Sequence, residues 1–190
     1  MFGSVLRASV DPESNKGKRD LVILDLMLFL RLRCSQVAGL ELSDIVRDSG
    51  RHWLHVTGKG TKTRRLKIND TAFASLMNWL KAANLSLSGS GAVFRSVNKG
   101  GVVGAHPVTA ATVGGLVSEY GAAAGLAPAH GDSRLAPHDL RRTAARNTLD
   151  NGANLVQVQS MPGHSSPDTT AGYIGAYDRD DDAAVDYVRY

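Results

Sequence analysis

Residues 136–174 read APHDLRRTAARNTLDNGANLVQVQSMPGHSSPDTTAGYI and contain two histidines, three arginines and a tyrosine among many small residues. Pro137 suits the first turn of a helix, and Gly152 suits its end. His138 and Arg141 are one turn apart on this helix and therefore share a face. Free N–H groups at a helix amino end, together with a planar guanidinium, favour an anion such as phosphate. A single histidine–arginine pair with this spacing more often lies on an ordinary helix surface, so an anion site here needs support from other residues.

The rest of the chain predicts a mainly α-helical domain with one small antiparallel β-sheet (α+β). Apolar residues recur at helical spacing in further segments, over residues 20–40, 71–83 and 109–124. Short helices are also expected around residues 155–161 and around Tyr173. Within residues 51–68, apolar and polar residues alternate on both sides of a Gly-Lys-Gly turn, which predicts a β-hairpin. One short strand is expected in the Gly/Ser-rich connection between residues 84 and 107.

Composition limits the class of protein. A chain of 190 residues with 43% hydrophobic and 21% charged residues has enough material for one buried core, which excludes a disordered chain or a fibre. The apolar run 21–30 contains Asp25 and is half the roughly 20 residues that a membrane span needs, so a core helix is expected. Residues 1–18 are expected to form a flexible lead-in or linker remnant without a signal peptide. The single cysteine, Cys34, fits a reducing cytoplasm.

Positive charge is concentrated in the body of the chain. Up to Tyr173 there are 20 Lys and Arg against 13 Asp and Glu, and beyond it 2 against 5. The segment 51–67 contains no carboxylate and carries Arg51, Lys59, Lys62, Arg64, Arg65 and Lys67. A segment with this charge could bind a polyanion. Taken alone, however, its pattern is better explained as a solvated hairpin.

Two further basic residues have positions that suggest chemistry. Arg33 interrupts a helix that otherwise looks buried, and an arginine there needs an anion or a carboxylate partner. Arg31 lies roughly 200° away around that helix, so the two side chains cannot serve one pocket and one of them is expected to reach outward. Lys59, at the tip of the predicted hairpin, could carry a proton to a leaving group.

Four motifs, taken together, resemble the catalytic domain of the tyrosine recombinases, the family of the phage integrases. The motifs are RLRCSQVAGLELSDI (31–45), VTGKGTKTRRLKI (56–68), HDLRRT (138–143) and GHSSPDTTAGY (163–173), and they occur in the family's order. In the last motif, Tyr173 follows His164 by nine residues, as in the family. The match covers about residues 19–175, so a catalytic domain of this fold is expected there.

The resemblance assigns a role to each motif residue. It implies that Tyr173 is the nucleophile, that Arg33 and Arg141 hold the non-bridging phosphate oxygens, and that Lys59 protonates the leaving 5′ oxygen. A phosphodiester repels nucleophiles by its charge, so two guanidinium groups would offset charge in the transition state.

The same resemblance implies further residues and partners. It gives His138 a part in proton transfer and His164 a hydrogen bond to the phosphate. It implies double-stranded DNA as partner, a homo-oligomer (a tetramer) on DNA and a monomer or weak oligomer without it, and no membrane, metal or cofactor. DNA-binding side chains are expected at Arg51, Lys62, Arg64, Arg65, Lys67 and Arg142.

Three departures from the family pattern leave alternatives open. Gln36 replaces a usual acidic residue, Arg31 a usual glycine, and Pro162 a usual apolar residue. A recombinase that cleaves and rejoins DNA is the first hypothesis, with an inactive DNA-binding module and a topoisomerase-like enzyme as alternatives. The family's amino-terminal clamping domain is either removed or never present, and the acidic tail 176–190 forms either a helix docked on a neighbouring protomer or a frayed end.

Overall fold

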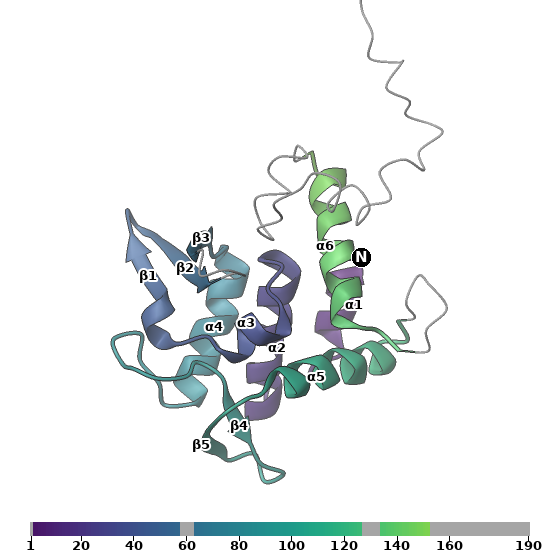
Figure 1. The fold of residues 1–190 in the computed structure, drawn as a ribbon. Helices are drawn as coiled ribbons and strands as arrows, with labels where there is room; N and C mark the ends of the chain where they lie inside the picture. Colours follow the sequence, from purple (N-terminus) through teal and green to yellow (C-terminus); the bar gives the residue numbers. More distant parts are fainter. Residues whose placement is uncertain (1, 58–62, 127–133, 153–190) are drawn as a thin grey trace, which may run out of the picture.

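Helix α2 (Asn15–Phe29) lies at the centre of the fold in the computed structural model, which describes residues 2–57, 63–126 and 134–152. Its residues 22–24, 26 and 27 are almost completely buried because other helices cover it on several sides. Figure 1 shows α4 and the larger sheet on one side of α2, and α1 and α6 on the other. The helices that contact α2 are α1 (Phe2–Ala8), α3 (Cys34–Ala38), α4 (Asp70–Ala82), α5 (Ala110–Ala123) and α6 (Pro137–Asp150).

Helix α1 corrects the expectation of a flexible lead-in over residues 1–18. Leu6 is fully buried and Val10 nearly so, and both belong to the hydrophobic core. The Nε atom of Arg7 donates to Oδ1 of Asp25 in α2 at 2.6 Å. The segment folds because its few apolar residues are buried in the core, although it also contains Gly, Ser, Pro, Asn and Lys.

The single helix expected over residues 20–40 is wrong, because the chain breaks between α2 and α3. Arg31 adopts a φ of 57°, in the left-handed region that favours glycine, and its side chain is fully buried. Arg33 is the N-cap residue of α3, with extended backbone angles and an exposed side chain. The expectation that the two side chains serve different environments is confirmed, but the buried one is Arg31.

The predicted hairpin is confirmed as β2 (Arg51–Thr57) and β3 (Thr63–Lys67), with Leu54 opposite Leu66. A third strand, β1 (Ile45–Asp48), pairs antiparallel with β2 and was not expected from the sequence, because four residues give too short an alternation to detect. It follows a 3₁₀ turn, η1 (Leu42–Asp44).

The two faces of this sheet differ in character. Leu54 and Val56 are buried on the inner face, which also carries Arg64 and Leu66 because residues opposite each other in the register share a face. The outer face carries Trp53 and the exposed basic residues, listed here from both strands: Arg51, Arg65 and Lys67.

The expected helices over residues 71–83, 109–124 and 137–152 are confirmed as α4, α5 and α6, so the mainly α-helical fold is confirmed. The connection between α4 and α5 contains two paired strands where one was expected, β4 (Arg95–Val97) and β5 (Val103–Pro107). The buried Nε1 atom of Trp79 donates to the carbonyl of Val93 at 2.8 Å and holds this connection on α4. Within the described ranges, no helix combines the length and the apolar character needed to cross a membrane.

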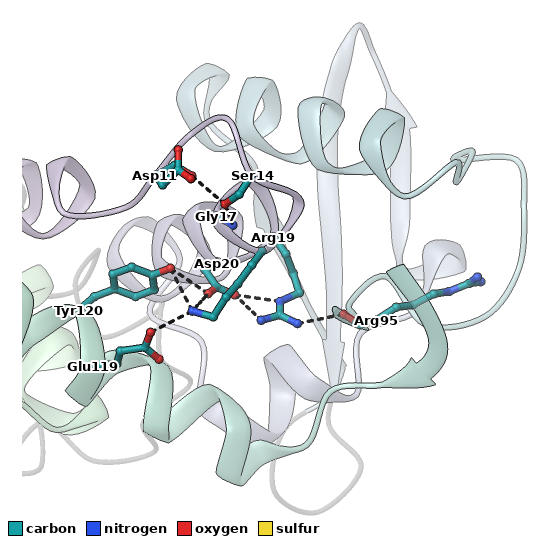
Figure 2. Close-up of polar contacts among 9 residues, drawn as sticks. Asp11, Ser14, Gly17, Arg19, Asp20, Arg95, Glu119 and Tyr120 are labelled. Carbon is teal, nitrogen blue, oxygen red and sulfur yellow. Dashed lines mark hydrogen bonds and ion pairs between the residues drawn. The ribbon is translucent and has the colours of Figure 1, made fainter. Parts of the chain in front are cut away.

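A buried carboxylate joins the beginning of α2 to α5. Figure 2 shows Asp20 between Arg19 and Tyr120. The Nε atom of Arg19 donates to Oδ1 of Asp20 at 2.8 Å, and the Tyr120 hydroxyl donates to Oδ2 at 3.0 Å. The Lys16 ammonium lies 3.0 Å from both Asp20 Oδ2 and Glu119 Oε1. Because Asp20 is fully buried, these donors compensate for the water that its carboxylate has lost.

Candidate active site

Arg141 lies at the amino-terminal half of α6 and contacts the break between α2 and α3. Its side chain is only 2% exposed, and its Nη1 atom donates a hydrogen bond to the main-chain carbonyl of Arg31. The carbonyl of Arg31 is two residues from Arg33, so this contact brings α6 against the start of α3. His138 and Arg141 both lie in the first two turns of α6, with His138 exposed and Arg141 buried.

Cys34 shows the same proximity from the side of α3. Burial raises the pKa of the Cys34 thiol, while the positive charge of Arg141 opposes that rise in pKa. The two residues are separated by more than a hundred positions in the sequence, yet the charge of one acts on the other. The first turn of α3 therefore faces Arg141.

Arg64 brings a third guanidinium group to this region from the inner face of the sheet. Burial, first, and then the positive charges of Arg141 and Arg33 lower the pKa of Arg64 to about 10. Its Nε and Nη2 atoms are buried and have no hydrogen-bond partner among the described residues. Arg33 and Arg141 are therefore close enough to Arg64 for their charges to act on it, and we call these three residues the three-arginine cluster.

Gln36 connects α3 to the strand that leads into the hairpin turn. Its Oε1 atom accepts from the backbone N–H of Arg33 at 3.0 Å, and its Nε2 atom donates to the carbonyl of Thr57 at 3.2 Å. A carboxylate could not make the second bond, because it has no proton to donate at neutral pH. The glutamine thus has a defined structural part at a position where an acidic residue is usual.

Several predicted site residues lie outside the described residues. They are Lys59 and Lys62 in the hairpin turn, and His164 and Tyr173 in the carboxyl-terminal segment, which also holds Pro162 and the helices expected near residues 155–161 and around Tyr173. Of the predicted catalytic set, the structure therefore places Arg33, His138 and Arg141.

The predicted DNA-binding residues separate into different environments. Arg65 is exposed, its Nη2 atom contacts Oδ2 of Asp48 on β1, and its guanidinium carbon lies 4.0 Å from the Trp53 ring centroid. The carboxylate missing from segment 51–67 is thus supplied by the neighbouring strand. Arg51 and Lys67 are exposed, Arg142 on α6 is half-buried, and Arg64 points inward.

The sequence contained a signal for Arg64 that composition concealed. Arg64, Leu66 and Ile68 occupy every second position, and Leu66 and Ile68 are the apolar members of the alternation. Period-two geometry therefore places Arg64 on the same face as the apolar residues. Grouping it with the other basic residues of the hairpin missed this.

Comparisons with known proteins agree with this geometry. The sequence profile of the Phage integrase family matches residues 5–179. Over 166 residues the chain is 36% identical to a tyrosine recombinase XerC of Corynebacterium efficiens, covering 87% of this chain and 49% of that protein. It is 30% identical over 166 residues to a tyrosine recombinase XerD of Staphylococcus haemolyticus, covering 86% of this chain and 52% of the relative. The chain belongs to the phage integrase family.

Solved structures show the same fold. The XerH site-specific recombinase in a post-cleavage complex with a palindromic difH substrate matches with a TM-score of 0.72 and 21% identity, over 93% of this chain and 48% of that one. The XerA recombinase matches with a TM-score of 0.68 and 20% identity, over 90% of this chain and 57% of that one. The chain spans about half the length of the curated relatives that it matches.

Proposed function

We propose that this chain is the strand-cleaving part of a site-specific DNA recombinase and that it acts through a covalent phosphotyrosine intermediate. The observation that carries the proposal is the position of Arg33 and Arg141, which α3 and α6 hold against one region in a chain of the phage integrase family. Two guanidinium groups at one place suit the two non-bridging oxygens of a phosphodiester.

The reaction that these residues would perform is a transesterification. The hydroxyl oxygen of Tyr173 attacks phosphorus, a bond from tyrosine oxygen to phosphorus forms, and the bond to the 5′ oxygen breaks. The tyrosine proton passes toward His138, and Lys59 gives a proton to the departing 5′ oxygen. His164 donates a hydrogen bond to the phosphate.

Rejoining is the same step in reverse. A free 5′ hydroxyl attacks phosphorus and gives its proton to Lys59, the bond from phosphorus to the tyrosine oxygen breaks, and the tyrosine takes a proton back from His138. The number of phosphoester bonds does not change, so no nucleotide hydrolysis is needed. Arg33 and Arg141 stabilise the negative charge on the oxygens of the pentacoordinate phosphorus in both directions.

The partner in this proposal is double-stranded DNA, which the protein binds as a homo-oligomer that reaches a tetramer at the exchange site, in the cytoplasm. Among the solved neighbours, one lambda integrase structure contains a dimer bound to a core site, which supports an oligomer on DNA. The exposed residues Arg51, Arg65 and Lys67 would contact phosphates other than the scissile one, together with Arg142 and Lys62.

The experiment that tests this proposal selects the DNA site from a random pool. The protein is incubated with random-sequence duplexes that each carry a nick. Cleavage near the nick releases a short fragment with a 5′ hydroxyl, and once this fragment is lost the covalent adduct cannot be rejoined. Strands that become covalently attached are recovered and sequenced, and the shared sequence defines a substrate. Recovery of one sequence supports a recombinase, capture without sequence preference supports a topoisomerase-like enzyme, and binding without capture supports an inactive module.

A further inference from the structure

The strand register fixes the direction of Arg64. It lies opposite Val56, which is 4% exposed, and two residues before Leu66 on the same face. Its neighbour Arg65 lies opposite His55 on the outer face. Two consecutive arginines of β3 therefore point to opposite sides of the sheet, and of the two it is Arg64 that shares the face of the buried residues Leu54 and Val56.

Three other arginines of the described residues have carboxylate partners. Arg19 pairs with Asp20, Arg7 pairs with Asp25, and Arg65 pairs with Asp48. In contrast, two nitrogen atoms of Arg64 are buried with no hydrogen-bond partner in the described part of the chain. A buried guanidinium nitrogen without an acceptor is unfavourable, so these atoms need an acceptor from water, an ion or a ligand.

The neighbouring charges make the arrangement more costly in the free protein. Arg33 and Arg141 both act on Arg64 as positive charges, and like charges in a half-buried region repel one another. An anion bound among them would offset this repulsion and provide oxygen acceptors for all three guanidinium groups. The ligand that fits is a phosphate group with free non-bridging oxygens.

We propose that Arg64 is a third arginine of the phosphate site, which contacts a non-bridging oxygen of the scissile phosphate and stabilises the charge that develops when the nucleophile attacks. This inference rests on the proposed function of the site and adds to it a residue of β3 to which the resemblance assigned no catalytic role. The gain over two arginines comes in the transition state, where phosphorus carries more negative charge on its oxygens than in the resting diester.

The first test compares Arg64→Gln with Arg47→Gln, a matched control at an exposed arginine of β1 in the same sheet. The measurement is the single-turnover rate of covalent adduct formation on the captured DNA sequence. We expect Arg64→Gln to lower the rate by about 100-fold, as for the loss of one preorganised oxyanion donor, and Arg47→Gln to lower it by less than about threefold. Equal rates for Arg64→Gln and the wild type would overturn the inference.

The second test separates contact with the phosphate from support of the sheet. A methylphosphonate linkage replaces one charged non-bridging oxygen with a methyl group, so less charge needs to be offset. On this substrate the wild type and Arg64→Gln both lack the contact to the replaced oxygen. We therefore expect the difference in rate between the two proteins to shrink to less than about tenfold. A difference as large as that on the ordinary diester would show that Arg64 acts through the fold, and would overturn the proposed contact.

A third measurement needs no cleavage and therefore distinguishes failure of this inference from failure of the proposed function. Inorganic phosphate should raise the thermal midpoint of the wild type more than that of Arg64→Gln, because a ligand stabilises the state that binds it. Without phosphate, Arg64→Gln should unfold at the same temperature as the wild type or higher, since a repelled charge is removed. If phosphate stabilises both proteins equally, the inference fails even where adducts form. If the wild type forms no adduct but shows the phosphate difference, the proposed reaction fails and the anion site remains.

Discussion

The Arg141 guanidinium donates a hydrogen bond to the main-chain carbonyl of Arg31, across 110 residues of sequence. This bond joins α6 to the break between α2 and α3, where Arg31 adopts a left-handed backbone conformation. Arg31 is two residues before Arg33, the N-cap residue of α3, so the bond holds Arg141 close to the start of that helix. The geometry of the three-arginine cluster therefore depends on a connection that neither helix contains by itself.

Arg141→Lys should damage both stability and cleavage. Lysine keeps the positive charge but has no planar fork, so it cannot bond the Arg31 carbonyl and a phosphate oxygen together. We expect a loss of about 1–3 kcal/mol in the free energy of unfolding, from the buried carbonyl left unpaired. Adduct formation should fall by about 100-fold or more. Urea unfolding and the adduct assay measure the two effects, and wild-type values in both would refute the assigned geometry.

Gln36 should act on cleavage through Lys59, because its amide holds the carbonyl of Thr57, the residue at the end of β2. Gln36→Ala should slow adduct formation in a protein that contains Lys59, and should add little to the defect of Lys59→Ala. In a double-mutant cycle, the losses caused by two coupled residues do not add, and the coupling energy is about 0.5–3 kcal/mol. Independent, additive losses would show that Gln36 supports the site by another route.

The assigned role of Lys59 can be tested with a better leaving group. When sulfur replaces the 5′ bridging oxygen, the departing thiolate is far less basic and needs no proton. Lys59→Ala should then cleave the sulfur-containing strand at nearly the wild-type rate, while Arg141→Lys stays slow on it. If the sulfur substitution leaves the Lys59→Ala defect unchanged, Lys59 is not the acid.

The contact between α2 and α5 should weaken at high pH. Burial and the negative charge of Asp20 raise the pKa of Tyr120 to about 12. Between about pH 10, where an unfolded tyrosine ionises, and pH 12, the folded state retains a proton that the unfolded state has lost. The free energy of unfolding should therefore fall as pH rises through this window.

Lys16 contributes in the same direction. Burial opposes its charge, but hydrogen bonds to Asp20 and Glu119 still raise the pKa of Lys16, so its contribution to stability is lost above its ordinary range. Tyr120→Phe removes only the tyrosine contribution, and its stability should decline less steeply with pH. Urea midpoints from pH 8 to 11.5 check this, and parallel curves for the two proteins would contradict it.

Gly17 should not tolerate a side chain, because a Cβ atom there would lie 1.6 Å from the carbonyl oxygen of Asp11. Gly17→Ala should lower the free energy of unfolding by about 1–3 kcal/mol through steric strain at the first turn of α2. The matched control is Gly115→Ala in α5, where the new methyl group meets nothing within 4 Å. The control should be stabilised by about 0.5–1 kcal/mol, since alanine favours helix. Equal effects at both glycines would refute the close approach.

The hairpin, α4, α5 and α6 could be predicted because their periodic patterns are set locally. Leu54 and Leu66 alternate with polar residues on paired strands, and Pro137 begins α6 as expected. The break before α3 could not be predicted in the same way. An apolar run hides it, and the carbonyl of Arg31 is held by Arg141, a contact between distant segments. The inward direction of Arg64 follows from its alternation with Leu66 and Ile68, and its charge alone gives no sign of that direction.

The most direct test of the central claim is to identify the residue that becomes attached to DNA. Tyr173 and Tyr177 are four residues apart, and the nine-residue step from His164 selects Tyr173. The wild type, Tyr173→Phe and Tyr177→Phe are incubated with the labelled, nicked sequence and analysed by denaturing electrophoresis and peptide mass, with and without EDTA. The account predicts an adduct on Tyr173 in the wild type and in Tyr177→Phe, none in Tyr173→Phe, and no effect of EDTA, because arginines supply the positive charge. An adduct that survives Tyr173→Phe but disappears in Tyr177→Phe would contradict it.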